Sequence, residues 1–369
     1  LTLTGANLSF TGATTINAGT LIVGNVGSLG SGAVTVNGGT LDLNYATIGA
    51  VANVITSNGG TIIGGQTTAS VTTTGSSSVD TVLTGTDGLS KADAGTLTLT
   101  TPNFYTGATA ASGASAVIKA AFLSDTSSSL GASSLTDPTN LVLASGATLE
   151  FIGTTSTTTS RSFTVDGSAG IATSSGASPL IFTTASKIAL VGANPELKLV
   201  ANNSGTNIFR AALSEADLLA GNGIQNLAID GTGTWVIGGN SNRFKGDIRI
   251  EAAAGATLGF ESGSLGMGSG YSTSVIRLNN NTVLVWSGAN TDDISSRLQI
   301  PTGATAKMNL ESNNVEFAAA PKDATGAALT SGTIQKYGTG TLKIATAVSS
   351  PGLNFDVPTG QLTINGTVG

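Results

Sequence analysis

Few residues in this sequence could carry out chemistry, and the one adjacent pair of acidic side chains is Asp292 and Asp293. Two carboxylic acids could act as the acid and the base of a glycosidase. The pair lies in Ala289-Asn-Thr-Asp-Asp-Ile, however, and Asp is common in turns and at helix N-caps, so we interpret both as turn residues. The sequence has no His and no Cys, which excludes Ser-His-Asp triads, Cys-His pairs and His-based metal sites.

A second group of charged side chains alternates with apolar residues along one segment. A polysaccharide lyase would need a Lys or Arg base beside a calcium ion held by carboxylates. The spacing of two residues instead places the charged side chains on one face of a strand, with Phe244, Ile248 and Ile250 on the other. We interpret them as a solvated face with cross-strand ion pairs. The charged residues are Arg243, Lys245, Asp247 and Arg249.

Asparagines and tryptophans are the remaining candidates for binding. Asn recurs near expected turns, at 202–203, 279–281 and 313–314. In stacked strands Asn can form ladders from coil to coil, although an amide-rich face could also contact sugars or a surface. Trp235 and Trp286 lie in apolar runs, and we expect both in the core. The tandem Gly-Gly-x-Gly-x-Asp calcium repeat is absent, and we predict no catalytic, cofactor-binding or metal-binding residue.

Composition limits the classes of function. Charged residues make up 10% of the 369 residues, hydrophobic residues make up 40%, and the formal net charge is −6. Lys and Arg form none of the dense clusters that bind phosphate backbones, so we expect no nucleic-acid partner. No run of 18 apolar residues occurs, so we expect no membrane insertion by this segment.

Two motifs recur in the same order three times. The first is a strand such as Gly95-Thr-Leu-Thr-Leu followed by Phe- or Tyr-Thr-Gly (Phe-Lys-Gly in the third copy) and another strand, and the second is Ser-Leu-Gly. The Ser-Leu-Gly copies are 28–30, 129–131 and 264–266. We predict a single β-helix segment over 1–369, with approximate repeat units 1–88, 89–227, 228–333 and a partial unit 334–369.

The strands of these motifs have apolar side chains at every second position, as at Leu97 and Leu99. Strands this short cannot bury a face alone, but stacked coils can, because each coil covers the core of the previous one. We therefore predict an all-β fold, a right-handed parallel β-helix (a solenoid), with about 20–25 residues per coil. An antiparallel sandwich or barrel is the alternative, because Asp-Gly pairs such as Asp87-Gly88 could form local hairpins.

Two insertions interrupt the pattern. Residues 154–178 are rich in Ser, Thr and Gly, and we predict a loop outside the core. Residues 207–221 carry apolar residues around Ser214-Glu-Ala-Asp and end at Gly221, which predicts one short helix packed on the solenoid.

These motifs resemble the autotransporter-associated β-strand repeat. The nearest match runs from Leu1-Thr-Leu-Thr-Gly-Ala-Asn through Phe10-Thr-Gly to Asn17-Ala-Gly-Thr-Leu, and Asn103-Phe-Tyr-Thr-Gly follows the same pattern. The third unit departs from it with Trp235 and with Phe244-Lys-Gly. The resemblance implies a bacterial parallel β-helix passenger, secreted or displayed at the cell surface, which is one segment of a larger outer-membrane-associated protein.

Such a passenger implies a non-catalytic structural or adhesive stalk, not an enzyme, with no cofactor. We expect end-to-end association with adjacent segments of the same chain or with identical subunits, in a filament or layer, because an open β-helix end exposes unpaired backbone groups. The alternative is a glycan-binding or glycan-processing β-helix protein, with glycans or cell surfaces as partners. Glycan binding would require exposed aromatic platforms, and glycan processing would require convergent carboxylates.

Overall fold

The computed structural model describes residues 1–6, 9–44, 49–132, 136–211, 213, 226–239, 246–251, 255–266, 274–345 and 352–365. The chain forms two compact units, Leu1–Ala172 with Ala185–Ala189 and Thr173–Thr184 with Leu190–Gly369. Short strands dominate both units. None of the helical segments in the described ranges has the length and apolar character needed to cross a membrane.

The first unit contains the strands up to β17 and one short 3-10 helix, η1 (Pro138–Asn140). The strands are β1 (Thr2–Leu3), β2 (Thr14–Ile16), β3 (Thr20–Val23), β4 (Val34–Val36), β5 (Thr40–Asp42), β6 (Ile55–Asn58), β7 (Thr61–Thr67), β8 (Val71–Thr74), β9 (Ser77–Leu83), β10 (Leu89–Lys91), β11 (Gly95–Leu99), β12 (Thr109–Ala111), β13 (Ala116–Ala120), β14 (Leu141–Ala144), β15 (Thr148–Phe151), β16 (Thr157–Thr159) and β17 (Phe163–Thr173).

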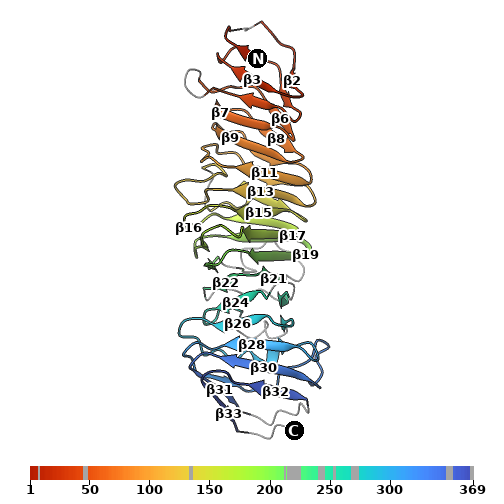
Figure 1. The fold of residues 1–369 in the computed structure, drawn as a ribbon, viewed down its shortest axis with the longest axis vertical. Helices are drawn as coiled ribbons and strands as arrows, with labels where there is room; N and C mark the ends of the chain where they lie inside the picture. Colours follow the sequence, from red (N-terminus) through yellow and green to blue (C-terminus); the bar gives the residue numbers. More distant parts are fainter. Residues whose placement is uncertain are drawn as a thin grey trace. The chain divides into compact units, whose positions relative to one another are not determined.

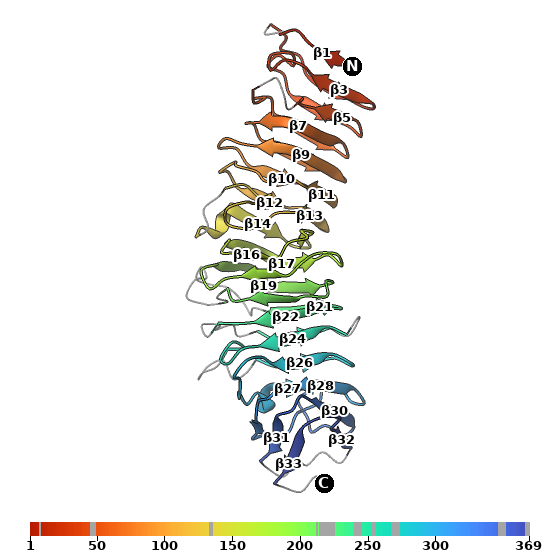
Figure 2. The ribbon, with the colours of Figure 1, turned by 60° about the vertical axis from the view of Figure 1, so that its left-hand side comes forward.

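In this unit, strands from successive coils pair in parallel. The odd-numbered strands from β1 to β15 form one ladder, in which Leu21 of β3 pairs with Leu41 of β5. The even-numbered strands from β2 to β14, followed by β17, form the second ladder. Figure 2 shows β1, β3, β5, β7 and β9 following one another in chain order. Each coil therefore adds one strand to each ladder, which is the topology of a parallel β-helix.

The core of the first unit consists of columns of aliphatic side chains. Leu97 pairs with Ile118, and Ile118 pairs with Leu149 on the next coil. All three side chains are buried, whereas Thr96 and Thr98 beside Leu97 are partly exposed. The alternation read from the sequence thus places the apolar residues inside and the threonines outside.

The second unit contains the later strands and a 3-10 helix, η3 (Ser295–Arg297). The strands are β18 (Leu180–Phe182), β19 (Ile188–Ala201, mostly in this unit), β20 (Thr206–Phe209), β21 (Asn226–Gly231), β22 (Thr234–Ile237), β23 (Ile248–Ile250), β24 (Thr257–Phe260), β25 (Ile276–Leu278), β26 (Val283–Trp286), β27 (Leu298–Gln299), β28 (Thr305–Asn309), β29 (Val315–Phe317), β30 (Gly332–Tyr337), β31 (Thr341–Ile344), β32 (Leu353–Asp356) and β33 (Gln361–Ile364).

These strands also form parallel ladders. The even-numbered strands from β18 to β32 make one ladder. The odd-numbered strands from β19 to β27 make a second, and β29, β31 and β33 make a third. Figure 1 shows β22, β24, β26 and β28 in chain order.

Aromatic side chains replace aliphatic ones in part of the core of the second unit. Phe260 of β24 pairs with Trp286 of β26, and their ring centroids are 5.0 Å apart. The Trp286 ring in turn lies 6.0 Å from that of Phe317. Tilted and edge-on contacts of this kind add to the stabilisation that burial of the rings provides.

The predicted all-β parallel β-helix is confirmed as the fold class. Coil length varies more than expected, because Thr61 pairs with Ser78 whereas Val117 pairs with Thr148. Insertions between strands account for the difference.

The structure corrects two local predictions. The predicted loop over 154–178 is wrong in part, because it contains β16 and β17, with Phe163 and Val165 buried in the core. Two apolar side chains at alternate positions anchor a strand there despite the surrounding Ser, Thr and Gly. The predicted helix over 207–221 is wrong at its start, because residues 207–209 belong to β20 and pair with β22. Of the rest of this predicted helix, the structure describes only residues 210, 211 and 213.

The inward and outward positions of β11 should differ in their effect on stability. Replacing Leu97, which is fully buried, with Ala should lower the free energy of unfolding by about 2–5 kcal/mol, because it leaves a cavity. The Thr98→Ala variant on the same strand is the matched control and should cost about 0.5 kcal/mol. Urea unfolding followed by circular dichroism measures both, and equal losses would contradict the alternation.

Candidate functional site

The Ser-Leu-Gly motif forms a buried turn that attaches each coil to the previous one. Its serine hydroxyl donates to a carbonyl at the end of a preceding strand, and its leucine is buried in the core. The hydroxyl bonds are Ser28 to Leu3 at 3.1 Å, Ser129 to Leu99 at 3.4 Å and Ser264 to Ile237 at 2.8 Å. The recurrence of this motif therefore has a structural cause.

The glycine of this motif lies against the Phe- or Tyr-Thr-Gly motif of the coil before it. Gly30 has φ +62°, and a Cβ there would lie 1.9 Å from the carbonyl oxygen of Phe10. Gly131 has φ +73° and is equally confined by Tyr105, whose carbonyl oxygen would lie 2.5 Å from a Cβ. Only glycine combines this conformation with so close an approach. The two motifs recur in a fixed order because they pack against each other.

A buried polar side chain from a later coil binds the carbonyl group of each of these glycines. Asn53 donates to Gly30 at 3.2 Å and to Gly32 at 2.7 Å. Arg161 donates to Gly131 at 2.7 Å. Arg297 donates to Gly266 at 3.0 Å and also to the carbonyl groups of Leu265 and Ser274.

Both of these arginines are more than nine-tenths buried. Burial lowers the pKa of the Arg161 and Arg297 guanidinium groups from the ordinary value. Arginine nevertheless stays charged in proteins, and its planar fork suits several carbonyl acceptors at once. We therefore assign Arg161 and Arg297 to the turns that they fix. Sequence reasoning missed both, because nothing in their local sequence indicates burial.

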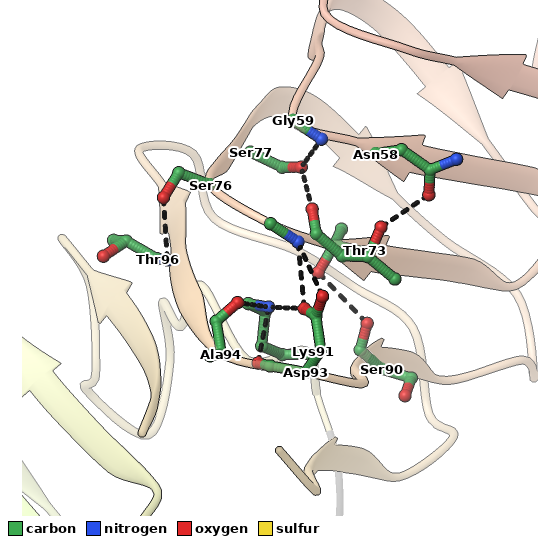
Figure 3. A network of polar contacts seen from close by, with 12 residues as sticks. Asn58, Gly59, Thr73, Ser76, Ser77, Ser90, Lys91, Asp93, Ala94 and Thr96 are labelled. Atoms are coloured by element: carbon green, nitrogen blue, oxygen red, sulfur yellow. Dashed lines mark hydrogen bonds and ion pairs between the residues drawn. The ribbon is translucent and has the colours of Figure 1, made fainter. Parts of the chain in front are cut away.

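A buried lysine occupies the core side of β10 and makes a polar network (Figure 3). The Lys91 ammonium donates to the carbonyl groups of Asp93 at 2.7 Å and Ala94 at 2.9 Å, and it pairs with the Asp93 carboxylate. The same carboxylate accepts from the Gly75 N–H of the preceding coil at 2.9 and 3.1 Å. The hydrogen bond from Lys91 and that from Gly75 lower the pKa of Asp93. The network connects two coils.

A second buried lysine has a similar arrangement in the other unit. The Lys336 ammonium donates to the carbonyl groups of Gly338 at 2.6 Å and Thr359 at 3.0 Å. Burial lowers the pKa of Lys336, a property shared by catalytic lysines. Both acceptors are backbone carbonyl groups of turns, so the contacts of this lysine are structural.

Asp292 and Asp293 lie in the connection between β26 and η3, outside strands and helices, as the sequence predicts. Asp292 accepts from the Ser262 hydroxyl at 2.8 Å and from the Gly263 N–H at 2.7 Å. Asp293 accepts from the Ser295 N–H at 2.9 Å and from the Ala318 N–H at 3.0 Å. Each carboxylate is thus an acceptor for neighbouring turns, and their contacts assign them no joint acid–base role.

The alternating charged segment is confirmed as an ion-paired face where the structure describes it. Arg249 of β23 pairs with Glu196 on β19 at 2.5 Å and with Glu251 at 3.2 Å. Asp247 lies 4.0 Å from Arg277 of β25. Arg243 and Lys245 lie outside the described residues.

Asparagines bridge coils in two ways. Buried ones bind backbone, as where the Asn313 amide donates to the Trp286 carbonyl at 2.9 Å, which confirms the structural interpretation there. Exposed ones form a ladder of the expected kind in the first unit, at residues that the sequence analysis did not single out. The Asn37 amide donates to Asn17 at 3.0 Å, and that of Asn58 donates to Asn37 at 2.8 Å. The signal was a Thr-x-Asn triplet repeated at one-coil intervals.

Aromatic side chains divide between core and surface. Trp235 and Trp286 are fully buried, as predicted. Phe104 and Phe122, which sequence reasoning did not single out, are 57% and 40% exposed in the turns after β11 and β13. Across the ranges that the structure describes, no three His, Cys, Asp or Glu side chains gather closely enough to hold a metal ion.

Comparison with known proteins agrees with this architecture. The passenger-associated-transport-repeat family matches residues 1–23, 89–114 and 230–254. The BmaC autotransporter adhesin of Brucella suis biovar 1 (strain 1330) is 35% identical over 125 residues, which are 33% of this chain and 4% of the adhesin. No solved structure gives a significant match. The chain carries passenger-associated transport repeats and is distantly similar to an autotransporter adhesin, which confirms the resemblance seen in its motifs.

Removing the Arg297 guanidinium should destabilise the second unit. The Arg297→Met variant leaves the carbonyl groups of Leu265, Gly266 and Ser274 without their buried donor, at a cost of about 2 kcal/mol or more in unfolding free energy. Arg277→Met is the matched control, because Arg277 is partly exposed and its loss should cost under about 1 kcal/mol. Chemical denaturation measures both, and equal losses would refute the structural assignment of Arg297.

Acid should weaken the coil connection made by Asp93. Its pKa lies below the ordinary value of 3.8, so the stabilisation is fully present above that value and is lost as the pH falls through the lowered folded-state pKa. The thermal midpoint of the native chain should therefore decline more steeply below about pH 4 than that of Asp93→Asn, which cannot ionise. If the thermal midpoints of the two proteins fell in parallel with pH, ionised Asp93 would contribute nothing to stability.

Proposed function

We propose that this chain is a non-catalytic segment of a bacterial surface passenger, serving as an adhesive or structural stalk outside the cell. The passenger-associated transport repeats and the similarity to an adhesin support the location and the class. The matched adhesin is far longer than the region shared, since the chain spans 4% of it. We propose that the stalk is likewise one part of a longer surface protein.

The proposal depends mainly on one observation, that the side chains able to do chemistry bind other parts of the same chain. In the part of the chain that the structure describes, Asp292, Asp293, Lys91 and Lys336 all bind turns or neighbouring coils. The buried arginines Arg161 and Arg297 do the same. A catalytic centre needs such groups directed at a substrate. Here they hold the stack together, which favours a scaffold.

We propose that the chain associates along the stacking direction, with an adjacent coil of the same parent chain or an identical subunit as the partner. The strand backbone groups of a coil are satisfied when another coil pairs with them, and its apolar side chains are stabilised when that coil covers them.

The proposed location and lack of catalysis can be tested together. Antibodies to the purified chain should label intact bacteria that make it, and external protease should remove the label. The purified chain should release no new sugar ends from polysaccharides. Labelling only after permeabilisation would contradict surface display. Turnover that disappears in an Asp292→Asn, Asp293→Asn variant would show an enzyme instead.

A further inference from the structure

One outward face of the first unit carries a column of hydroxyl groups in register. The central residues of β2, β4, β6, β8 and β10 pair directly with one another from coil to coil. Neighbouring strands lie about 4.8 Å apart, so the hydroxyls repeat at that interval. The residues are Thr15, Thr35, Thr56, Thr72 and Ser90.

None of these five hydroxyl groups has a hydrogen-bond partner among the residues that the structure describes. The residues are exposed or partly exposed. The hydroxyls of Ser28, Ser77 and Ser264, by contrast, are buried and donate to backbone carbonyl groups. The outward column therefore has free donors and acceptors that contribute nothing to the internal bonding of the coils.

The asparagine ladder lies beside this column, two residues further along each strand. Asn37 donates to Asn17 at 3.0 Å, Asn58 donates to Asn37 at 2.8 Å, and the Thr74 hydroxyl donates to Asn58 at 2.5 Å. These bonds fix the amides in one orientation. An amide nitrogen has two hydrogens, and each donor amide uses one on its neighbour, which leaves the other available to a ligand. The face is thus pre-organised before anything binds.

Charge and polarity restrict what such a face can bind. Residues 1–79 contain a single charged side chain, Asp42. It lies on β5, in the other ladder of the first unit. A polyanion would need cations, and a protein partner would need an apolar or aromatic centre, which a hydroxyl and amide array does not provide. A neutral, hydroxyl-rich polymer matches both the polarity and the lack of charge.

We propose that the outward face of β2, β4, β6, β8 and β10 binds a linear, uncharged polysaccharide that runs along the stacking direction. A pyranose in an extended chain advances by nearly one coil spacing, so successive sugars meet equivalent hydroxyl and amide groups. Threonine methyl groups supply the apolar contact for the C–H face of each sugar, so this site differs from the aromatic platform that the sequence analysis expects of a glycan-binding protein. The inference rests on the proposed adhesive function and names its ligand class.

The affinity for a polysaccharide should depend on the length of the polysaccharide, because the contacts repeat from coil to coil. Each coil contributes weak, repeated contacts, and linking successive sugars makes every later contact intramolecular. Affinity should therefore rise with chain length up to the number of coils in the array. The array ends at β10, where Asp87 and Asp93 flank the strand and the next outward residue in the column is Ala110.

The test titrates the 369-residue chain with neutral oligosaccharides of two to eight sugars: β-1,4-glucan, β-1,3-glucan, β-1,4-mannan and poly-N-acetylglucosamine. Isothermal titration should show binding of at least one series that strengthens with length. The variant Thr35→Val, Thr56→Val, Thr72→Val keeps the side-chain shape and removes three hydroxyls, and it should weaken binding about tenfold or more.

A matched variant on the opposite ladder provides the control. Thr20, Thr40 and Thr61 also form an outward column, but the column beside them contains Ile22, Asp42 and Ile63 instead of amides. Replacing these three threonines with Val should leave affinity within about twofold. Circular dichroism melts of both triple variants establish that each is folded.

Several results would overturn the inference. They are no binding of any neutral series at millimolar concentration, equal weakening by both triple variants, or preference for a sulfated polymer. Loss of binding on replacing Phe104 and Phe122 with Ser, with the threonine face unaffected, would place the site at the exposed aromatic turns instead. Surface labelling of bacteria is independent of these outcomes, so failure here leaves the proposed stalk intact.

Discussion

Parallel pairing between successive coils is the constraint on which the rest of each unit depends. Every strand hydrogen-bonds to the strands one coil away, so the turns must bring the chain back in register. The turns bury backbone carbonyl groups that no strand can satisfy, and an unpaired buried carbonyl is costly. Asn53, Arg161 and Arg297 meet this need from a later coil. These three side chains must be polar because the stacked coils bury carbonyl groups that need a donor.

The two repeated motifs follow from the same requirement. Gly30 and Gly131 fit against the carbonyl groups of Phe10 and Tyr105 on the previous coil, so each motif provides the surface that the other needs. A repeat with only one of them would leave a gap or a clash at the turn. This coupling explains why the motifs keep their order while the lengths between them vary.

The strands and the core could be predicted from the sequence, because the alternation of apolar and polar residues is a local signal. Leu97 and Leu99 show this alternation, and both are buried. The prediction from sequence failed around Phe163 and Val165, because the many Ser and Thr residues of that segment made its alternation hard to recognise. Buried Arg297 could not be recognised, since its partners lie in turns up to 32 residues away and depend on coil lengths that only the pairing register fixes. The acidic pair lies in a connection between β26 and η3, and the preference of Asp for such irregular segments is also a local signal.

The alternation that builds the core also determines what the outer face can do. Thr35 lies between the buried residues Val34 and Val36, and Thr56 lies between the buried residues Ile55 and Ser57, so both threonines must point outward, paired from coil to coil. Inward polar groups such as the Ser57 hydroxyl bind backbone within the stack, whereas the outward hydroxyls of Thr35 and Thr56 have no hydrogen-bond partner among the described residues. Sequence can therefore change on that face at little cost in stability. The outward columns are thus the positions at which the proposed ligand-binding surface can vary without disturbing the core.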